Sequence, residues 1–276
     1  MALYKAAGKG NGTEVARLLA AGADPDARGE EGLTALHAAA VCGHTRVVRT
    51  MLAGGASPMQ PGMAGMLPIH MAAACGKLAA TRLLLEAAPG TAVAVDQAGH
   101  TPLFLAAQRG DAPLVRLLTA AAPQAAVVKT VDGQETPLFA AARGGHDNVV
   151  HMLVEAAPEA AVEVSVQHGG SGLTPLLAAC VQGHTAVVRQ LLEAAPQAAL
   201  WEQVPAPCPG LGRTLPAIFQ RSQAEAALLV ARLPPADSAR LRAFALALHR
   251  AQHCMHIHLP AELVGRILSL FDAFDV

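Results

Sequence analysis

Histidine is the residue type in this sequence with the widest chemical repertoire, because it binds metals and moves protons near neutral pH. Twelve histidines occur in 276 residues, and the densest group is His253-Cys254-Met255-His256-Ile257-His258. A structural zinc site normally needs a second ligand pair at a distance that a loop can span, and the chain has no Cys-x-x-Cys pair. We predict no metal and no cofactor, and interpret this segment as a connector between helices, with metal binding as the alternative.

Sequence motifs for catalysis are absent. The chain has no G-x-x-x-x-G-K loop for phosphates, no G-x-S-x-G turn for a nucleophilic serine and no H-E-x-x-H pair for zinc. Acidic residues such as Glu86, Glu155 and Glu193 are dispersed, and we interpret them as solvated surface. We therefore predict that the protein is not an enzyme.

Composition limits the compartments and partners. The formal net charge is −1, so the chain lacks the excess of positive charge that is typical of nucleic-acid-binding proteins. No apolar run approaches the length of about 18 residues that spans a bilayer, and the start Met1-Ala-Leu-Tyr-Lys lacks the layout of a signal peptide. Five cysteines, an odd number, predict reduced thiols and an intracellular protein, cytoplasmic or nuclear. We expect Cys42, Cys75 and Cys180 to be small residues packed between helices.

A repeated motif indicates the secondary-structure elements that position the histidines and cysteines. Thr34-Ala-Leu-His37 returns as Leu67-Pro-Ile-His70, Thr101-Pro-Leu-Phe104, Thr136-Pro-Leu-Phe139 and Thr174-Pro-Leu-Leu177. The N-terminus fits the same register from Met1, and a degenerate copy begins at Thr214. The starts of consecutive copies are then 33, 33, 34, 35, 38 and 40 residues apart. A period near 33 with a T-P-L-H-x-A core is the signature of ankyrin repeats, so this chain resembles an ankyrin-repeat protein.

The resemblance implies an all-α solenoid of about seven helix-turn-helix repeats, with degenerate repeats at the ends and β-hairpin fingers between repeats. We assign residues 1–235 to this domain and residues 236–276 to a C-terminal helical extension. Within one copy, Gly32 suits a turn with positive φ, Thr34 suits a helix N-cap, and Gly43 suits a left-handed C-cap. An apolar stripe then predicts a second helix, through Val47, Val48, Met51 and Leu52 in this copy.

Later copies depart from the family pattern in two ways. The turn after the second helix becomes Ala-Ala-Pro, at Pro89, Pro123, Pro158 and Pro196, and proline stops the helix there by another route. The resemblance implies that His37 and His70 bond backbone between loops. Phe104, Phe139 and Leu177 replace this histidine, so we expect apolar contact in its place.

The fingers lengthen toward the C-terminus. From Asp24 to Thr34 there are 10 steps, whereas there are 16 from Pro158 to Thr174 and 18 from Pro196 to Thr214. Insertions in repeat proteins often map to the binding face, so we predict partner contacts in residues 162–171 and 200–211. Trp201 is either an interface anchor or a cover for the side of the last repeats.

These features predict a non-catalytic protein that binds another protein through the concave face and fingers of the array, as a monomer, with no nucleic acid and no membrane. Candidate contact positions vary among the copies while the scaffold positions repeat. On the fingers they are Glu30, Glu31, Leu33, Gln97, His100, Asp132, Glu135, Ser171, Leu173, Trp201, Leu211 and Arg213; on the first helices they are Val41, Gln108, Arg109, Arg143 and Gln182.

A second motif lies near the C-terminus. Leu259-Pro260-Ala-Glu-Leu263 with Ile267-Leu268 is similar to the opening of an F-box. That resemblance implies that Leu259, Pro260, Leu263, Ile267 and Leu268 face the linker subunit of a cullin ubiquitin ligase, which would make the protein a substrate adaptor. The alternative is a capping helix that covers the core of the last repeat.

Overall fold

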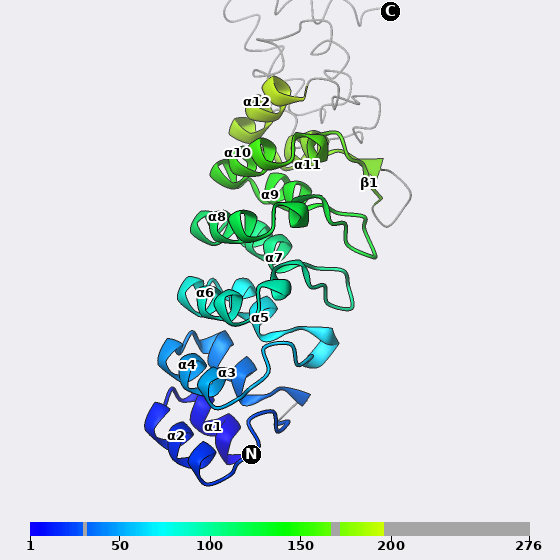
Figure 1. Ribbon diagram of the computed structural model, residues 1–276. Helices are drawn as coiled ribbons and strands as arrows, with labels where there is room; N and C mark the ends of the chain where they lie inside the picture. The colour runs from blue at the N-terminus through cyan, green and yellow to red at the C-terminus, as the bar shows by residue number, and fades with distance from the viewer. Residues whose placement is uncertain (30–31, 167–171, 196–276) are drawn as a thin grey trace, which may run out of the picture.

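The computed structural model describes residues 1–29, 32–166 and 172–195, and it shows an all-α solenoid in which helical hairpins stack in one direction (Figure 1). The first helices of the hairpins are α1 (Ala2–Gly8), α3 (Ala35–Cys42), α5 (Pro68–Ala74), α7 (Pro102–Arg109), α9 (Pro137–Gly144) and α11 (Pro175–Gln182). The second helices are α2 (Gly12–Ala20), α4 (Thr45–Ala53), α6 (Leu78–Ala87), α8 (Ala112–Ala121), α10 (Asp147–Ala156) and α12 (Thr185–Ala194). The degenerate copy from Thr214 and the predicted C-terminal extension lie outside the described residues.

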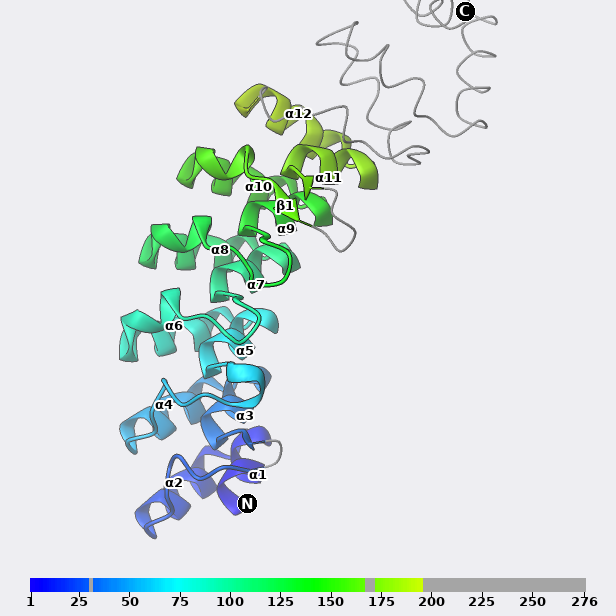
Figure 2. The same ribbon diagram turned by 90° about the vertical axis from the view of Figure 1, so that its right-hand side faces the viewer.

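The hairpins form two parallel rows of helices. Within the described repeats, each first helix contacts the first helix of the next repeat, and each second helix contacts the next second helix. The segments between repeats project as fingers from the side of the first helices, to the right in Figure 1, and Figure 2 shows the same stack from that side. The fingers and the first helices therefore share one face of the molecule.

The predicted helix starts are confirmed. The Oγ1 atoms of Thr101, Thr136 and Thr174 accept hydrogen bonds from the N–H of the third helical residue at 3.1, 3.2 and 3.3 Å. Proline follows each threonine at the first helical position, where its missing N–H costs no hydrogen bond. The chain thus begins each of these helices with its own cap.

The core is made of alanines and of the predicted apolar stripes. An alanine five residues after each helix-opening position is fully buried, and this lets the first helices approach closely: Ala39, Ala72, Ala106, Ala141 and Ala179. The stripes of the second helices are buried as predicted, including Val48, Leu84, Val115, Val150 and Val188, except that Leu52 is only partly buried. Cys180 is buried as expected, but the expectation for Cys42 is wrong, since that residue is exposed at the end of α3. Cys75 is only partly buried, at the C-cap of α5.

The Ala-Ala-Pro segments end the second helices as predicted, at Ala87, Ala121 and Ala156. Three of these prolines also open a short 3-10 helix, which the sequence pattern did not predict: η3 (Pro89–Val93), η4 (Pro123–Val127) and η5 (Pro158–Ala161). Pro196 lies outside the described residues. A further 3-10 turn, η2 (Met63–Gly65), lies in an earlier finger. The helices η3, η4 and η5 lead the chain from the second-helix row toward the fingers.

One lengthened finger contains the predicted β-hairpin. Strand β1 (Ser165–Val166) pairs antiparallel with β2 (Gly172–Leu173). In the first finger the hairpin is reduced to a single antiparallel bridge between Arg28 and Thr34. The other fingers form turns closed by hydrogen bonds, and these turns shape the candidate site.

Candidate functional site

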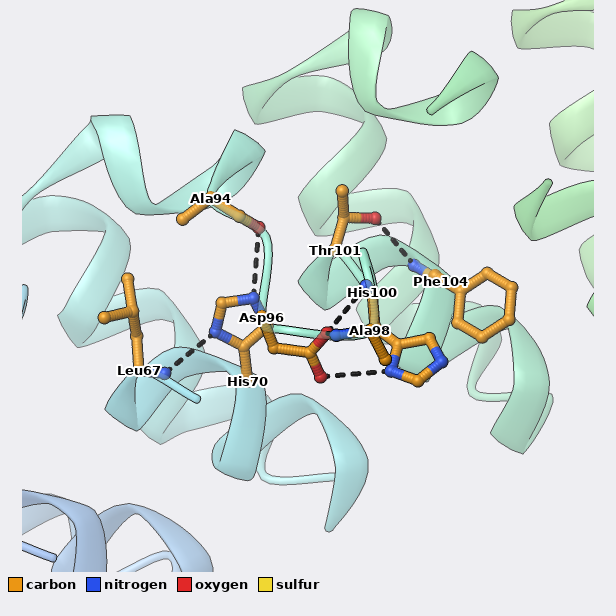
Figure 3. A network of polar contacts seen from close by, with 8 residues as sticks. All are labelled: Leu67, His70, Ala94, Asp96, Ala98, His100, Thr101 and Phe104. Atoms are coloured by element: carbon orange, nitrogen blue, oxygen red, sulfur yellow. Dashed lines mark hydrogen bonds and ion pairs between the residues drawn. The ribbon is translucent and has the colours of Figure 1, made fainter. Parts of the chain in front are cut away.

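Two buried histidines connect first helices to the fingers that follow them. The backbone N–H of Leu67 donates to Nδ1 of His70 at 3.1 Å, so Nε2 carries the ring proton and donates to the Ala94 carbonyl at 3.0 Å (Figure 3). His37 does the same with the Thr34 N–H and the Met66 carbonyl, at 3.1 and 3.0 Å. This is the link between loops that the sequence resemblance implied.

Burial lowers the pKa of both of these histidines, because the charged ring would lose its hydration inside the stack. The carbonyl hydrogen bonds, to Met66 for His37 and to Ala94 for His70, act in the opposite direction and raise the pKa. Since burial is the largest effect, the rings are neutral at pH 7. Their chemistry is therefore structural, and they fix the bases of two fingers.

Asp96 organises the finger that follows His70. Its Oδ1 accepts hydrogen bonds from the backbone N–H groups of Ala98 and His100 at 2.9 and 2.8 Å, and its Oδ2 accepts one from Nδ1 of His100 at 3.0 Å (Figure 3). The residue is only 7 % exposed, so a buried carboxylate holds the turn closed. The His100 ring stacks on Phe104, with 4.8 Å between ring centroids.

The next finger is one residue longer and closes differently. Thr130 takes the place of Asp96: its Oγ1 accepts from the Glu135 N–H and its own N–H donates to the Glu135 carbonyl, both at 3.0 Å. Gln134 adopts φ 50°, a left-handed conformation that is uncommon for a residue with a Cβ. Glu135 forms an ion pair with Arg143, whose guanidinium lies 5.6 Å from the centre of the Phe139 ring.

Hydrogen bonds also join neighbouring fingers to each other. The Gln97 N–H donates to the Ala64 carbonyl at 3.0 Å, and the Val131 N–H donates to the Ala98 carbonyl at 2.8 Å. At the ends of the series, Arg28 Nη1 donates to the Pro61 carbonyl at 3.1 Å and Lys129 pairs with Glu163. We call this chain of linked fingers, from Arg28 to Glu163, the finger rim.

A cleft of about 420 Å³ opens between the fingers of the fourth and fifth repeats. Its lining is Ala98, His100, Phe104, Gln108, Thr130, Asp132, Gly133, Glu135 and Arg143. Five of these residues, from two fingers and from the C-terminal ends of α7 and α9, are contact positions predicted from the sequence: His100, Gln108, Asp132, Glu135 and Arg143. The fold thus brings together side chains that lie more than one repeat apart in the chain.

Other predicted contact residues lie elsewhere on the same face. Gln97, Arg109 and Gln182 are exposed, and Val41 is partly buried. Leu33 and Leu173 are 9 % and 8 % exposed, so the prediction that they contact a partner is not supported. Glu30, Glu31, Ser171, Trp201, Leu211, Arg213 and the docking positions Leu259, Pro260, Leu263, Ile267 and Leu268 lie outside the described residues, as does the group from His253 to His258.

Sequence reasoning missed two important side chains of the site. Asp96 organises one finger but is not exposed, and its signal is an acidic residue five positions before a helix-opening threonine. Phe104 was expected to make apolar contact, yet its stacking with His100 at the cleft was not predicted.

Residues 1–29, 32–166 and 172–195 contain no group of three or more His, Cys, Asp or Glu side chains placed to hold a metal ion. Within those same ranges, none of the helices combines the length and the apolar character that crossing a bilayer requires.

Comparison with known proteins agrees with the architecture. A family model for ankyrin repeats matches three overlapping stretches of the chain, residues 3–92, 69–163 and 124–202. No curated protein matches the sequence. The family matches cover most of the chain, and the stacked hairpins, threonine caps and fingers lie where the repeats predict them. The chain therefore belongs to the ankyrin-repeat family.

Proposed function

We propose that this protein is a non-catalytic recognition module that binds a partner protein with its finger rim and the adjoining ends of the first helices. Ankyrin repeats generally serve protein–protein interaction, and this supports the class of function. The observation that carries the proposed surface is the cleft, because five variable side chains meet there on a backbone that is otherwise repetitive. We further propose a monomeric intracellular protein without nucleic-acid or membrane partners.

The energetic centre of this surface is expected at the cleft rather than along the whole rim. Interfaces draw most of their affinity from a few residues near their centre. Gln108 is exposed on α7, while Arg143 is held by its ion pair with Glu135 and lies over the Phe139 ring. This arrangement offers both an adaptable amide and rigid charged groups.

A photo-crosslinking experiment tests the proposal. A photoreactive amino acid is placed at Gln108 in one full-length variant and at Arg116, which is exposed on α8 in the second-helix row, in a matched control. In cell lysate, Gln108 should crosslink one specific protein while Arg116 does not. Crosslinking of the same protein from Arg116 alone would place the partner on the opposite row and overturn the proposal.

A second candidate function is substrate adaptor of a cullin ubiquitin ligase, with residues 236–276 as the docking segment. The F-box-like run from Leu259 to Leu268 supports it. Leu263→Asp in the full chain should then abolish capture of the ligase linker subunit while the crosslink from Gln108 persists. If the full chain never captures that subunit, the segment is a cap for the repeats.

A further inference from the structure

The His100 ring gives the cleft a hydrogen-bond acceptor that has no partner among the described residues. Nδ1 of His100 faces a carboxylate oxygen of Asp96, which can only accept, so this nitrogen carries the proton. In the neutral ring, Nε2 is then an acceptor, and it has no hydrogen-bond partner among the described residues. Figure 3 shows the rest of the ring turned away from Asp96.

The charges of the cleft are also unequal. The cleft is lined by two carboxylates, those of Asp132 and Glu135, but by only one guanidinium, that of Arg143. Glu135 and Arg143 already compensate each other in an ion pair, whereas Asp132 is exposed and makes no ion pair or hydrogen bond within the described residues. The uncompensated charge that faces an incoming ligand is therefore negative.

The protein itself contains an example of the group that fits such surroundings. Arg143 stands seven residues after Thr136, and Gln108 stands at the same register seven residues after Thr101. In the fifth repeat the guanidinium of Arg143 lies over Phe139 and pairs with Glu135. In the fourth repeat the aromatic base is present, as the stacked Phe104 and His100, but Gln108 supplies no cation.

We propose that this cleft binds a basic side chain of the partner protein, an arginine in the best fit, between His100, Gln108 and Asp132. The inference rests on the proposed function, since it names the chemistry of the partner at the same surface. A guanidinium carries five donors in one plane, so it pairs with the Asp132 carboxylate and also donates to Nε2 of His100. A cleft of about 420 Å³ holds this side chain together with part of its backbone.

The test starts from the purified full chain and a library of random linear peptides. Selected peptides should share an arginine, and its replacement by citrulline, a neutral side chain of the same shape, should weaken binding by about tenfold. Asp132→Asn should cause a similar loss. Asp147→Asn, at an exposed acidic residue at the start of α10, is the matched control and should leave the affinity unchanged.

A second variant tests whether the space beside Phe104 and His100, where Gln108 supplies no cation, is the binding site. Gln108→Arg gives the fourth repeat its own guanidinium, and we expect it to compete with the peptide and weaken binding by about tenfold or more. Thermal unfolding of each variant shows that the fold is kept. Peptides without a basic residue, failure to select any peptide, or unchanged affinity of Asp132→Asn would overturn the inference.

Two results separate this inference from the function on which it rests. If acidic peptides are selected and Arg143→Gln abolishes their binding, the proposal of a basic ligand is wrong, but the proposed recognition surface stands. A partner crosslinked from Arg116 alone overturns the surface as well, because that residue lies in the row of second helices.

Discussion

At the scale of single residues, the buried histidines make the stability of the stack depend on pH. The ordinary pKa of histidine is 6.5, and burial lowers it for His37 and His70 in the folded state. Below about pH 6.5 these two histidines therefore bind protons in the unfolded chain but not in the folded chain. The free energy of unfolding consequently falls as the pH falls. Above that pH both states are neutral and these two residues add no pH dependence.

We predict that urea unfolding at pH 5.5 gives a lower free energy of unfolding than at pH 7.5. Phenylalanine occupies the equivalent place at Phe104 and Phe139, so the variant His37→Phe with His70→Phe retains a known packing solution. Its free energy of unfolding should change less between the two pH values than that of the parent chain. An equal change in both proteins would show that other groups cause the dependence.

The Glu135–Arg143 ion pair is predicted to matter more for binding than for folding. The side chains are 15 % and 35 % exposed, and ion pairs with this access to water contribute at most about 1 kcal/mol. A double-mutant cycle of Glu135→Gln and Arg143→Gln, measured by urea unfolding, should therefore give a coupling energy below about 1 kcal/mol. A coupling of several kcal/mol would mean that the pair is a structural centre of the finger.

At the scale of elements, the glycine that ends α7 tolerates no side chain. Gly110 ends α7 with φ 79°, and an added Cβ would lie 2.4 Å from Nδ1 of His146 in the next repeat. His146 in turn bonds the Gln108 carbonyl through Nε2 at 3.1 Å, so the ring is not free to move aside. One glycine thus controls both a helix end and a contact between repeats.

We predict that Gly110→Ala destabilises the protein by at least about 1 kcal/mol, the cost of the left-handed backbone alone. Gly90, in η3, is the control, because an added Cβ there meets no atom within 4 Å and its φ is not positive. Gly90→Ala should leave the unfolding midpoint in urea almost unchanged. Equal midpoints for the two variants would contradict this account of the turn.

The elements differ in how well the sequence predicts them. Threonine caps, buried stripes and the glycine turns follow from local chemistry, so the helices were predictable within a residue or two. The 3-10 helices that begin at Pro89, Pro123 and Pro158 were not predictable, since helices this short have no apolar period of their own. Leu33 and Leu173 are buried although they vary among the copies, so variation alone does not predict which finger residues are exposed.

The cleft was predictable in its residues but not in its shape. Variation among copies identified His100, Gln108 and Arg143 because such positions carry no scaffold role. Their meeting depends on the backbone bond from Val131 to Ala98 and on the left-handed Gln134, and neither has a marker in residue identity. Main-chain contacts between fingers are therefore the part of the site that only the structure supplies.

At the scale of the whole molecule, each repeat depends on its immediate neighbours alone. Stability in such an array is a sum of repeat terms and interface terms, so a defect acts locally. Ala106 is fully buried in the row of first helices and offers a place to introduce one. A larger side chain there would separate α7 from its neighbours.

We predict that Ala106→Leu destabilises the chain by about 1–3 kcal/mol through overpacking. Amide hydrogen exchange should speed up mainly in the third to fifth repeats, and the helices α1 and α2 should keep most of their protection. Leucine has nearly the helix propensity of alanine, so a loss of this size reports overpacking and not helix propensity. A uniform increase from α1 to α12 would show that the array unfolds as one unit.

The finger rim has a thermodynamic consequence for any partner. Because backbone hydrogen bonds tie Ala64 to Gln97 and Ala98 to Val131, the loops have already lost their conformational entropy when the chain folds. A docking protein meets a preorganised surface and need not order it, so association carries a smaller entropic penalty. The rim therefore acts as a rigid template, and adaptation during complex formation falls to the partner.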